Sequence, residues 1–177
     1  DIYSMKIKIV IFLFLLNTLI LHAYESEDKL KTVIVGKIAK YISWHEHTSD
    51  YFVITVLNNE FGSLFDEVYR DRSIKNRPVK IQYITNIEDM NSSDILFISQ
   101  KNLHDIDEIL LKTKDLNILT VSDLRGFAQK GGSVQLYFLG RNLKIIINID
   151  AMKEKHFRVN NRLIRVSEIL KGEDDDK

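Results

Sequence analysis

Residues 51–69 read YFVITVLNNEFGSLFDEVY, and this stretch decides the fold. Its first part, Tyr51 to Leu57, is β-branched and aromatic, which predicts a strand. Asn58 and Asn59 can then cap a helix, because their side chains accept hydrogen bonds from free backbone amides. The apolar residues of that helix recur at helical spacing: Phe61, Leu64, Phe65, Val68 and Tyr69. A strand that leads directly into a helix is the unit from which α/β domains are built.

The same alternation continues on both sides of this unit. Upstream, Ser26 is placed to cap an amphipathic helix that ends near Trp44. Downstream, Asn102 is placed to cap another helix. The strands expected in this region are Val79 to Ile84, Ile95 to Ile98 and Ile118 to Val121. Strands that alternate with helices are joined by right-handed crossovers, and they form a largely parallel sheet.

The C-terminal part of the chain predicts a β-hairpin. Ser133 to Leu139 alternates between apolar and polar residues, Gly140 to Asn142 is a tight turn, and Leu143 to Ile149 is again strand-like. Asn148 interrupts this second apolar strand. A buried amide must find hydrogen-bond partners, so we expect Asn148 to hold a loop in place.

Two short helices are expected after the hairpin. Asp150 is placed to cap the first, and Asn161 begins the second, which carries apolar residues as far as Leu170. The elements together predict a single α/β domain. Its sheet is mixed but mostly parallel, has about six strands with the hairpin in the C-terminal half, and is flanked by helices.

The composition excludes several classes of protein. The chain has 177 residues, of which 45% are hydrophobic and 28% charged, which suits one compact domain. Its 25 basic and 25 acidic residues give no overall electrostatic attraction to nucleic acid or to an anionic membrane surface, so we expect no nucleic-acid partner. The absence of cysteine excludes disulfides, thiolate zinc sites, iron–sulfur clusters and a cysteine nucleophile.

The N-terminal segment has the pattern of a secretory signal peptide. Lys6 and Lys8 follow Met5, the run from Ile9 to Leu21 is mostly apolar, and Ala23 is a small residue before a polar chain. We therefore expect residues 1–23 to be a signal peptide with a few upstream residues. An uncleaved N-terminal anchor is the alternative. Residues 24–171 would then form the exported domain, followed by an acidic tail at 172–177.

The sequence gives no positive support for an enzyme. The chain contains no nucleophile elbow, P-loop, dinucleotide fingerprint or zincin motif. His45 and His47 flank Glu46 just after Trp44, but a metal site normally requires a third or fourth ligand. The sequence therefore predicts a non-catalytic protein with no metal site and no cofactor.

Glycines cluster in the segment between the strand ending at Val121 and the hairpin. Because open α/β sheets bind ligands at the carboxyl ends of their strands, this segment predicts a small-molecule pocket. Its candidate residues are Asp123, Gly126, Phe127, Gly131 and Gly132. The alternative is structural: the glycines permit the turn into the hairpin, and the Asp123 side chain satisfies backbone donors of a turn.

Aromatic and arginine side chains suggest where a protein partner would bind. These residue types dominate the binding energy of protein interfaces. The candidates are Tyr41, Trp44, Arg158, Arg162 and Arg165. Tyr41 and Trp44 also continue the apolar stripe of the first helix, so the alternative is that both belong to the core.

Several short strings occur between about Leu30 and Leu170 in a specific order, although each is weak alone. They are Lys37–Trp44, Phe61–Gly62, Arg77–Val79, Asp94–Ser99, Leu119–Asp123, Gly126–Ala128, Gly131–Gly132, Ile147–Asn148 and Asn161–Val166. Because these strings occur together and in this order, the chain resembles the YfiR-like family of periplasmic regulatory proteins. The resemblance implies an exported domain with a mixed sheet and flanking helices.

The resemblance also implies a function. The named member of the family is a periplasmic, non-catalytic protein that represses an inner-membrane diguanylate cyclase by contacting its sensor region, which lowers cyclic-di-GMP and biofilm formation. The implied partner is thus an inner-membrane diguanylate cyclase or sensor kinase, and the protein could act as a homodimer. The alternative is a small-molecule-binding sensor domain that acts with another receptor, such as a histidine kinase.

Two departures from the family limit this transfer. The named member has cysteines whose disulfides link it to the periplasmic redox state, and this chain has none, so redox control does not carry over. The usual Trp-Pro of the family is Trp44-His45 here, which changes the chain's exit from the first helix. Neither departure affects the prediction of the fold.

Overall fold

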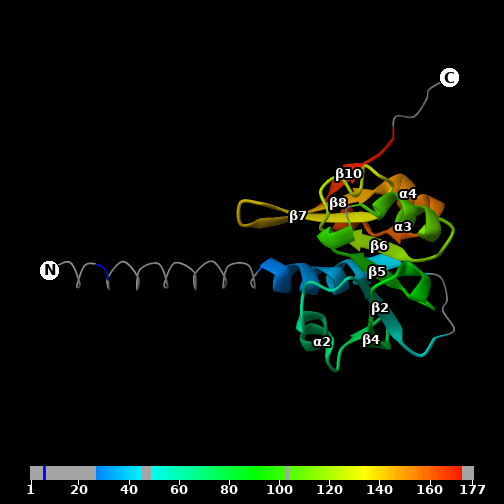
Figure 1. The fold of residues 1–177 in the computed structure, drawn as a ribbon. Helices are drawn as coiled ribbons and strands as arrows, with labels where there is room; N and C mark the ends of the chain where they lie inside the picture. Colours follow the sequence, from blue (N-terminus) through cyan, green and yellow to red (C-terminus); the bar gives the residue numbers. More distant parts are fainter. Residues whose placement is uncertain (1–5, 7–26, 45–48, 103, 173–177) are drawn as a thin grey trace, which may run out of the picture.

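The computed structural model describes residues 27–44, 49–102 and 104–172, together with Lys6 (Figure 1). The remainder of the predicted signal peptide, the Ser26 cap, His45, His47 and residues 173–177 of the predicted acidic tail lie outside this part. Among the described residues, no helix has both the length and the apolar content needed to cross a membrane.

A sheet of eight strands forms the centre of the domain, in the order β10-β8-β7-β6-β5-β2-β4-β3. The pairs β10–β8, β7–β6, β6–β5, β5–β2 and β2–β4 are parallel, and β8–β7 and β4–β3 are antiparallel. The strands are β2 (Phe52–Leu57), β3 (Ser73–Ile74), β4 (Arg77–Ile84), β5 (Ile95–Ile98), β6 (Leu119–Ser122), β7 (Val134–Leu139), β8 (Asn142–Asn148) and β10 (Glu168–Leu170).

The predicted mixed, mostly parallel sheet is confirmed, including the hairpin, which is β7 and β8. The sheet has eight strands where about six were expected, because β3 and β10 extend its two edges. These two strands contain only two and three residues, which is too short for a periodic pattern to reveal them. The far end of the hairpin projects beyond the body of the domain (Figure 1).

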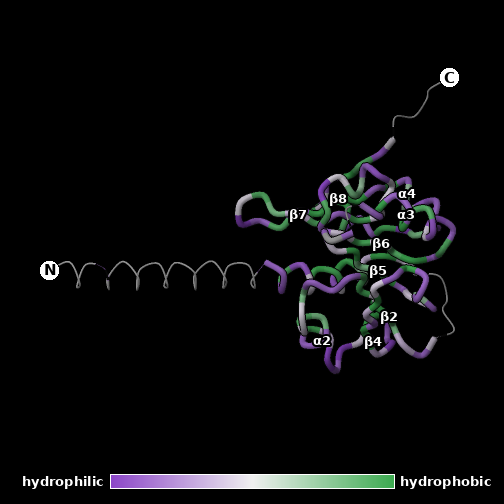
Figure 2. Tube along the Cα trace, in the orientation of Figure 1, coloured by the Kyte–Doolittle hydropathy of each residue, from purple (hydrophilic) through white to green (hydrophobic). Residues whose placement is uncertain are grey.

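Helices cover both faces of the sheet. The first helix (residues 27–40), α2 (Leu64–Tyr69), α4 (Ile149–Glu154) and α5 (Asn161–Ile164) contribute to one hydrophobic cluster, and α3 (Ile106–Thr113) contributes to the other. Alternate residues of β5 divide in the same way: Ile95 and Phe97 belong to the first cluster, Leu96 and Ile98 to the second. A sheet buried on both faces explains why its central strands are continuous apolar runs, as Figure 2 shows.

The first helix ends earlier than predicted. Its last helical residue is Lys40 rather than Trp44, and Ile42–Ser43 forms a short strand, β1. This strand pairs with β9 (Arg158–Val159) in an antiparallel ribbon separate from the main sheet. Two-residue strands have no sequence signature, so only the folded chain reveals that these distant segments meet.

The final helix is also shorter than predicted. It covers only Asn161–Ile164, and the chain then forms β10, which pairs with β8. Val166, assigned to the helix by its spacing, is 71% exposed. Pairing with a long neighbouring strand has outweighed a weak helical pattern here.

Asparagine side chains fix several of the connections. As predicted, Asn148 holds a loop: its Nδ2 donates to Ala128 O at 2.8 Å. Its Oδ1 also caps α4 by accepting from the backbone amides of Asp150 and Ala151, so Asp150 is not the cap that the sequence suggested. Likewise α3 begins after Asp105, while Asn102 ends a preceding 3-10 turn.

Candidate functional site

The first helix links two edges of the sheet. Near its start, Lys31 contacts Asp123, which follows β6, and beyond its end Trp44 packs on Phe52, the first residue of β2. The helix therefore runs from the carboxyl edge of the parallel strands to their amino edge. The pocket candidates lie near the first edge, and the partner-binding candidates lie near the second.

Lys31 forms a buried ion cluster at the carboxyl edge. Its Nζ lies 2.8 Å from Asp123 Oδ2 and 3.2 Å from Asp28 Oδ1. The Lys31, Asp123 and Asp28 side chains are only 10%, 7% and 11% exposed. One ammonium group is thus shared by two desolvated carboxylates.

Burial and charge oppose each other in this cluster. Burial raises the pKa of Asp123 above its ordinary value, although the hydrogen bond and charge of Lys31 act to lower it. Burial alone would lower the pKa of Lys31, but its hydrogen bonds and charge interactions with Asp123 and Asp28 raise that pKa overall. The lysine therefore stays charged, and burial makes Asp123 easier to protonate than an ordinary exposed aspartate.

A cleft of about 830 Å³ opens beside this cluster. Lys31 and Asp123 contribute to its polar side, and Tyr137 and Leu139 of the projecting hairpin contribute to its other wall. Asp123 Oδ1 is a buried oxygen without a hydrogen-bond partner among the described side chains. The cleft therefore combines apolar surface, mixed charges and an unsatisfied carboxylate oxygen, which are features of a small-molecule site.

The predicted pocket residues do not all line this cleft. Asp123 and Gly126 do, whereas Gly131 lines a neighbouring hollow of about 340 Å³. Phe127 is fully buried in the core. A Cβ atom on Gly132 would lie 2.1 Å from the Phe127 ring, so this glycine permits close packing against that ring.

The crevice between β2 and β5 is filled by the chain itself. The chain order reverses here, and open α/β sheets commonly bind ligands at such a point. In this protein Asn58 Nδ2 donates to Asn102 Oδ1 at 2.6 Å, and Ser99 Oγ donates to Asn58 O at 2.9 Å. This network occupies the crevice, and the larger cleft lies further along the edge, beside β6 and β7.

A tyrosine hydroxyl is inserted in the middle of the first helix. Gly36 N donates to Tyr69 Oη at 2.6 Å, and Tyr69 Oη donates to Thr32 O at 2.7 Å. The hydroxyl thus bridges two backbone groups that an unbroken helix would join directly, an arrangement that bends helices. Gly36 is required because a Cβ there would lie 2.6 Å from the same oxygen. Burial raises the pKa of Tyr69, so the hydroxyl stays protonated and can donate.

The β1–β9 ribbon brings Arg158, one of the partner-binding candidates, beside the segment that holds Tyr41. Ser43 pairs with Arg158, and Asn160 N donates to Tyr41 O at 2.8 Å. Tyr41 is 40% exposed. The arginines, which all lie on the surface, are Arg158, Arg162 and Arg165. We call the exposed residues Tyr41 and Arg158 the ribbon face; Arg162 and Arg165 lie in and just after α5, which follows β9.

Trp44 supports this face from beneath. It is half-buried, its Nε1 donates to Ala39 O at 3.0 Å, and its ring packs edge-on against Phe52 and Phe157 at centroid distances of 5.2 and 5.0 Å. The position of Trp44 agrees with the alternative in which it belongs to the core.

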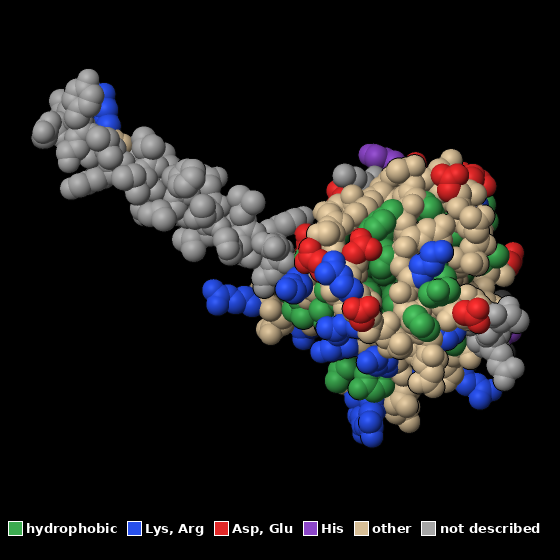
Figure 3. Space-filling view, turned by 90° about the horizontal axis from the view of Figure 1, so that it is seen from below, with side chains coloured by type: hydrophobic (Ala, Val, Ile, Leu, Met, Phe, Trp, Pro, Cys, Tyr) green, Lys and Arg blue, Asp and Glu red, His purple; other side chains and the backbone are tan. Residues whose placement is uncertain are grey.

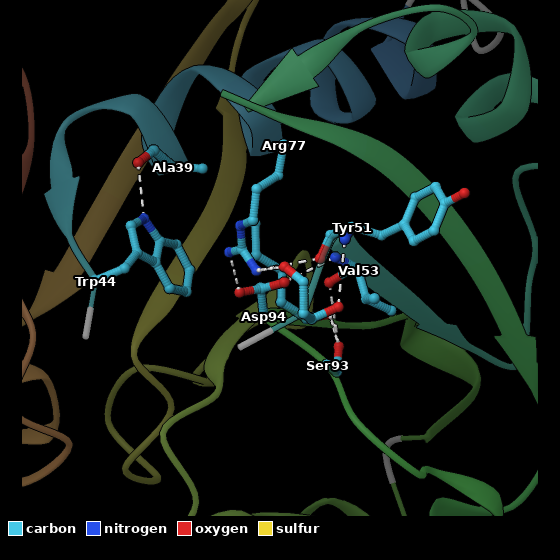
Figure 4. Close-up of polar contacts among 9 residues, drawn as sticks. Ala39, Trp44, Tyr51, Val53, Arg77, Ser93 and Asp94 are labelled. Carbon is cyan, nitrogen blue, oxygen red and sulfur yellow. Dashed lines mark hydrogen bonds and ion pairs between the residues drawn. The ribbon is translucent and has the colours of Figure 1, made fainter. Parts of the chain in front are cut away.

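An ion pair fixes the strands beside Trp44 (Figure 4). Arg77 Nη2 lies 2.6 Å from Asp94 Oδ1, and Asp94 Oδ2 accepts from Val53 N at 2.7 Å. The Arg77 guanidinium also lies over the Phe52 ring, 5.1 Å from its centroid. Arg77 and Asp94 occur in two of the strings that suggested the family. Here they tie together the starts of β4, β5 and β2, so we assign them a structural role.

No cluster of three or more potential metal ligands of the His, Cys, Asp or Glu type occurs in the part of the chain that the structure describes. His45 and His47 lie outside that part, so their arrangement is not defined.

The chain matches the model of one protein family, and its fold is similar to that of solved structures. A family model described as YfiR/HmsC-like matches residues 28–168. No curated protein matches the chain.

Two solved structures share the fold. A conserved domain protein from Vibrio cholerae has a TM-score of 0.56 and 9% identity, and the match covers 80% of this chain and 59% of that one. The ABC domain from Streptococcus pneumonia in complex with L-Trp has a TM-score of 0.55 and 7% identity, covering 76% of this chain and 59% of that one. At these identities the likeness concerns the fold alone.

Proposed function

Because the chain belongs to the YfiR/HmsC-like family of periplasmic, non-catalytic regulators of cyclic-di-GMP signalling, we propose that it represses an inner-membrane diguanylate cyclase by binding its sensor region. The family implies an inner-membrane signalling partner. Export by the signal peptide at residues 1–23 and a folded domain at 24–171 are part of the same proposal.

The observation that carries this proposal is the ribbon face. The chain from Tyr41 to Ser43 and the chain from Arg158 to Asn160 are far apart in the sequence, yet β1–β9 pairing places them side by side. The face is polar and aromatic at its surface, and it rests on the packed Trp44 ring. A rigid base under exposed arginine and tyrosine side chains is what a protein-binding surface needs.

Repression requires that the domain distinguish two states of its partner. A bound protein shifts a conformational equilibrium only by its difference in affinity for the two states. The domain would therefore bind the inactive arrangement of the sensor region more tightly, and an envelope signal would act by weakening this contact. No catalytic group is needed for such a role.

The test is capture of the partner in living cells. A photo-crosslinking residue at position 162, at the edge of the ribbon face, should join the exported protein to an inner-membrane signalling protein, which mass spectrometry identifies. Tyr41→Ala with Arg158→Ala should lower capture at least tenfold and raise cyclic-di-GMP, because such residues often contribute more than 1 kcal/mol each. Leu111→Ala with Lys114→Ala is the matched control, since both side chains are exposed on and after α3.

Unchanged capture in the Tyr41 and Arg158 variant would move the contact away from the ribbon face. Recovery of no signalling protein from the wild type would refute the regulatory proposal itself.

The cleft at the carboxyl edge favours a second candidate function, small-molecule sensing on behalf of a receptor such as a histidine kinase. The specific observation is the unpartnered Asp123 Oδ1 next to a cleft of about 830 Å³. A metabolite that binds the folded domain should raise its melting temperature saturably. Asp123→Asn should abolish this shift, whereas a flat response across a broad metabolite library would count against sensing.

A further inference from the structure

A small basic hollow lies between the first helix and the loop that follows α2. It has a volume of about 100 Å³, and Lys37, Lys40 and Arg72 line it. Lys37 and Lys40 are both exposed and lie three residues apart, so they share one side of the helix. Among the described residues, neither these two lysines nor Arg72 forms an ion pair with a carboxylate.

A fourth cation belongs to the same surface. Lys75 Nζ donates to the backbone oxygen of Lys40 at 3.2 Å. We call Lys37, Lys40, Arg72 and Lys75 the basic surface. The loop also carries one acidic residue, Asp71. Figure 3 shows Lys and Arg side chains gathering on one part of the face that it displays, with only scattered carboxylates between them.

Several other lysines of the domain are paired with acidic residues. Lys31 is held by two aspartates, Lys130 Nζ lies 2.7 Å from Asp107 Oδ1, and Lys112 Nζ lies 2.8 Å from Glu108 Oε1. The overall balance of 25 basic and 25 acidic residues therefore conceals a local excess of positive charge. The sequence predicts no overall attraction to anionic surfaces, but the folded protein places four cations close together that have no carboxylate partner among the described residues.

The geometry points to the phosphate group as the ligand. Lysine ammonium groups bind phosphate as point charges, and an arginine can add a directed pair of donors. The hollow is well below the ~300 Å³ of a typical small-ligand site. A single phosphate group therefore suits it better than a peptide segment or a whole metabolite.

We propose that the basic surface binds the phosphates of anionic phospholipids and holds the domain against the membrane. The exposed Tyr41 at its border supports a lipid source for the phosphate, because tyrosine favours the interface between apolar and aqueous phases. The four cations lie on the first helix, in the loop after α2 and in the β3–β4 turn, and Lys75 is outside the lining of the hollow, so a surface with many headgroups can contact them together. This inference goes beyond the proposed function, since it concerns a lipid surface and not the signalling partner.

The experiment measures binding of the processed protein, purified from the periplasm, to lipid vesicles. Vesicles of equal parts phosphatidylglycerol and phosphatidylcholine should bind it at low salt, and pure phosphatidylcholine vesicles should not. Binding should fall steeply as salt rises, because exposed charges are screened within about 8 Å at physiological ionic strength. Co-flotation with the vesicles gives the partition coefficient.

Charge-matched variants locate the contact. Lys37→Gln with Lys40→Gln should lower the partition coefficient roughly tenfold or more, since each basic residue near an anionic surface contributes a factor of about five. Lys114→Gln with Lys144→Gln removes the same charge elsewhere and should leave the partition coefficient within about twofold. Equal losses in the two variants would overturn the proposal, because they would show unspecific attraction.

A further arm separates lipid from free anion. If millimolar inorganic phosphate stabilises the protein but the vesicles do not bind, the ligand is a soluble phosphate and the lipid assignment is wrong. If an acidic peptide binds in a manner that depends on Lys37 and Lys40 and vesicles do not, the surface recognises protein instead. The Arg158→Ala variant keeps Tyr41 and all four cations of the basic surface, so loss of partner capture there can be distinguished from loss of vesicle binding.

Discussion

The two ends of the first helix use the same residue type in opposite ways. At the start, Lys31 is buried and shared by two carboxylates, whereas Lys37 and Lys40 are exposed and have no carboxylate partner among the described residues. A buried ammonium group needs a carboxylate or hydrogen-bond acceptors, because leaving water is costly, but an exposed one does not. Burial thus decides which lysines hold the domain together and which remain available to a partner or a membrane.

Removing the buried lysine should produce the largest effect. Lys31→Met leaves Asp28 and Asp123 close together in a desolvated site, and breaking a buried pair in this way costs about 3–5 kcal/mol. Urea denaturation should show this fall in the free energy of unfolding. The control, Lys37→Met on the same helix, should change it by no more than about 0.5 kcal/mol.

The deficit of Lys31→Met should depend on pH. Burial raises the pKa of Asp123 in the folded protein, so the folded state retains a proton that the unfolded chain has released. Without Lys31 this pKa rises further, and the variant gains relative to wild type as the pH is lowered toward ~4, where the carboxylates become neutral. A deficit that stays constant from pH 7 to 4 would contradict the assignment of its cause to unpaired carboxylates.

A third kind of lysine sharpens the comparison. Lys155 is buried, but its Nζ donates to the backbone carbonyls of Thr113 and Leu116 and not to a carboxylate. Burial lowers the pKa of Lys155 from 10.5 to about 8, although the charges of Asp115 and Glu154 act to raise it. Lys31 and Lys155 are therefore both buried, yet their pKa values shift in opposite directions.

This difference predicts a pH dependence of stability. Between pH 8 and 10.5 the unfolded chain holds a proton on Lys155 that the folded protein has released, so the free energy of unfolding rises with pH. The rise is up to about 3 kcal/mol, from 1.36 kcal/mol for each pKa unit. In urea denaturation over this range, the free energy of unfolding of wild type should rise relative to that of Lys155→Met. Parallel pH profiles would contradict the prediction, because the tyrosines titrate in both proteins.

The sequence predicts the long elements well and the short ones poorly. β5 was expected at Ile95 to Ile98, and it occupies these residues, because a continuous apolar run between turn signals suits a strand buried on both faces. β1 and β9 have two residues each, and β10 replaced the end of an expected helix. Pairing partners that lie far away in the chain decide such segments, and local spacing does not report them.

In the candidate sites, too, the sequence predicts local features but not contacts between residues far apart in the chain. The position of Asp123 at the end of β6 predicted that it would lie at the carboxyl edge, and it does. Its partner Lys31 was missed because 92 residues separate them and an amphipathic helix gives no sign of which polar residue is buried. The basic surface was hidden by the even overall charge, which says nothing about how charges are distributed on the folded chain.

The middle of the first helix tests whether its two ends behave as one rigid unit. Gly36→Ala places a Cβ 2.6 Å from Tyr69 Oη, and overpacking of this kind costs about 1–3 kcal/mol, partly offset by the better helix propensity of alanine. Hydrogen exchange should show lower protection both near Lys31 and in β1. The same substitution should cost less in a Tyr69→Phe background. An equal cost there would show that the hydroxyl is not the obstacle.

The smallest predicted effect is the change in protein stability when the exposed lysines at the C-terminal end of the first helix are replaced. Lys37→Gln and Lys40→Gln remove exposed charges that have no carboxylate partner, so each should change the free energy of unfolding by about 0.5 kcal/mol or less. The sign should be positive, because neutralising one member of a like-charged group relieves repulsion, and added salt should remove the gain by screening. Thermal denaturation at low and high salt measures the gain in stability and its dependence on salt.

Destabilisation by more than 1 kcal/mol would show that these lysines stabilise the fold, as Lys31 does, and are not available to a ligand. A small gain in stability combined with a large loss of vesicle binding would separate the two ends of the helix, since Lys37 and Lys40 would then serve binding and Lys31 would serve folding.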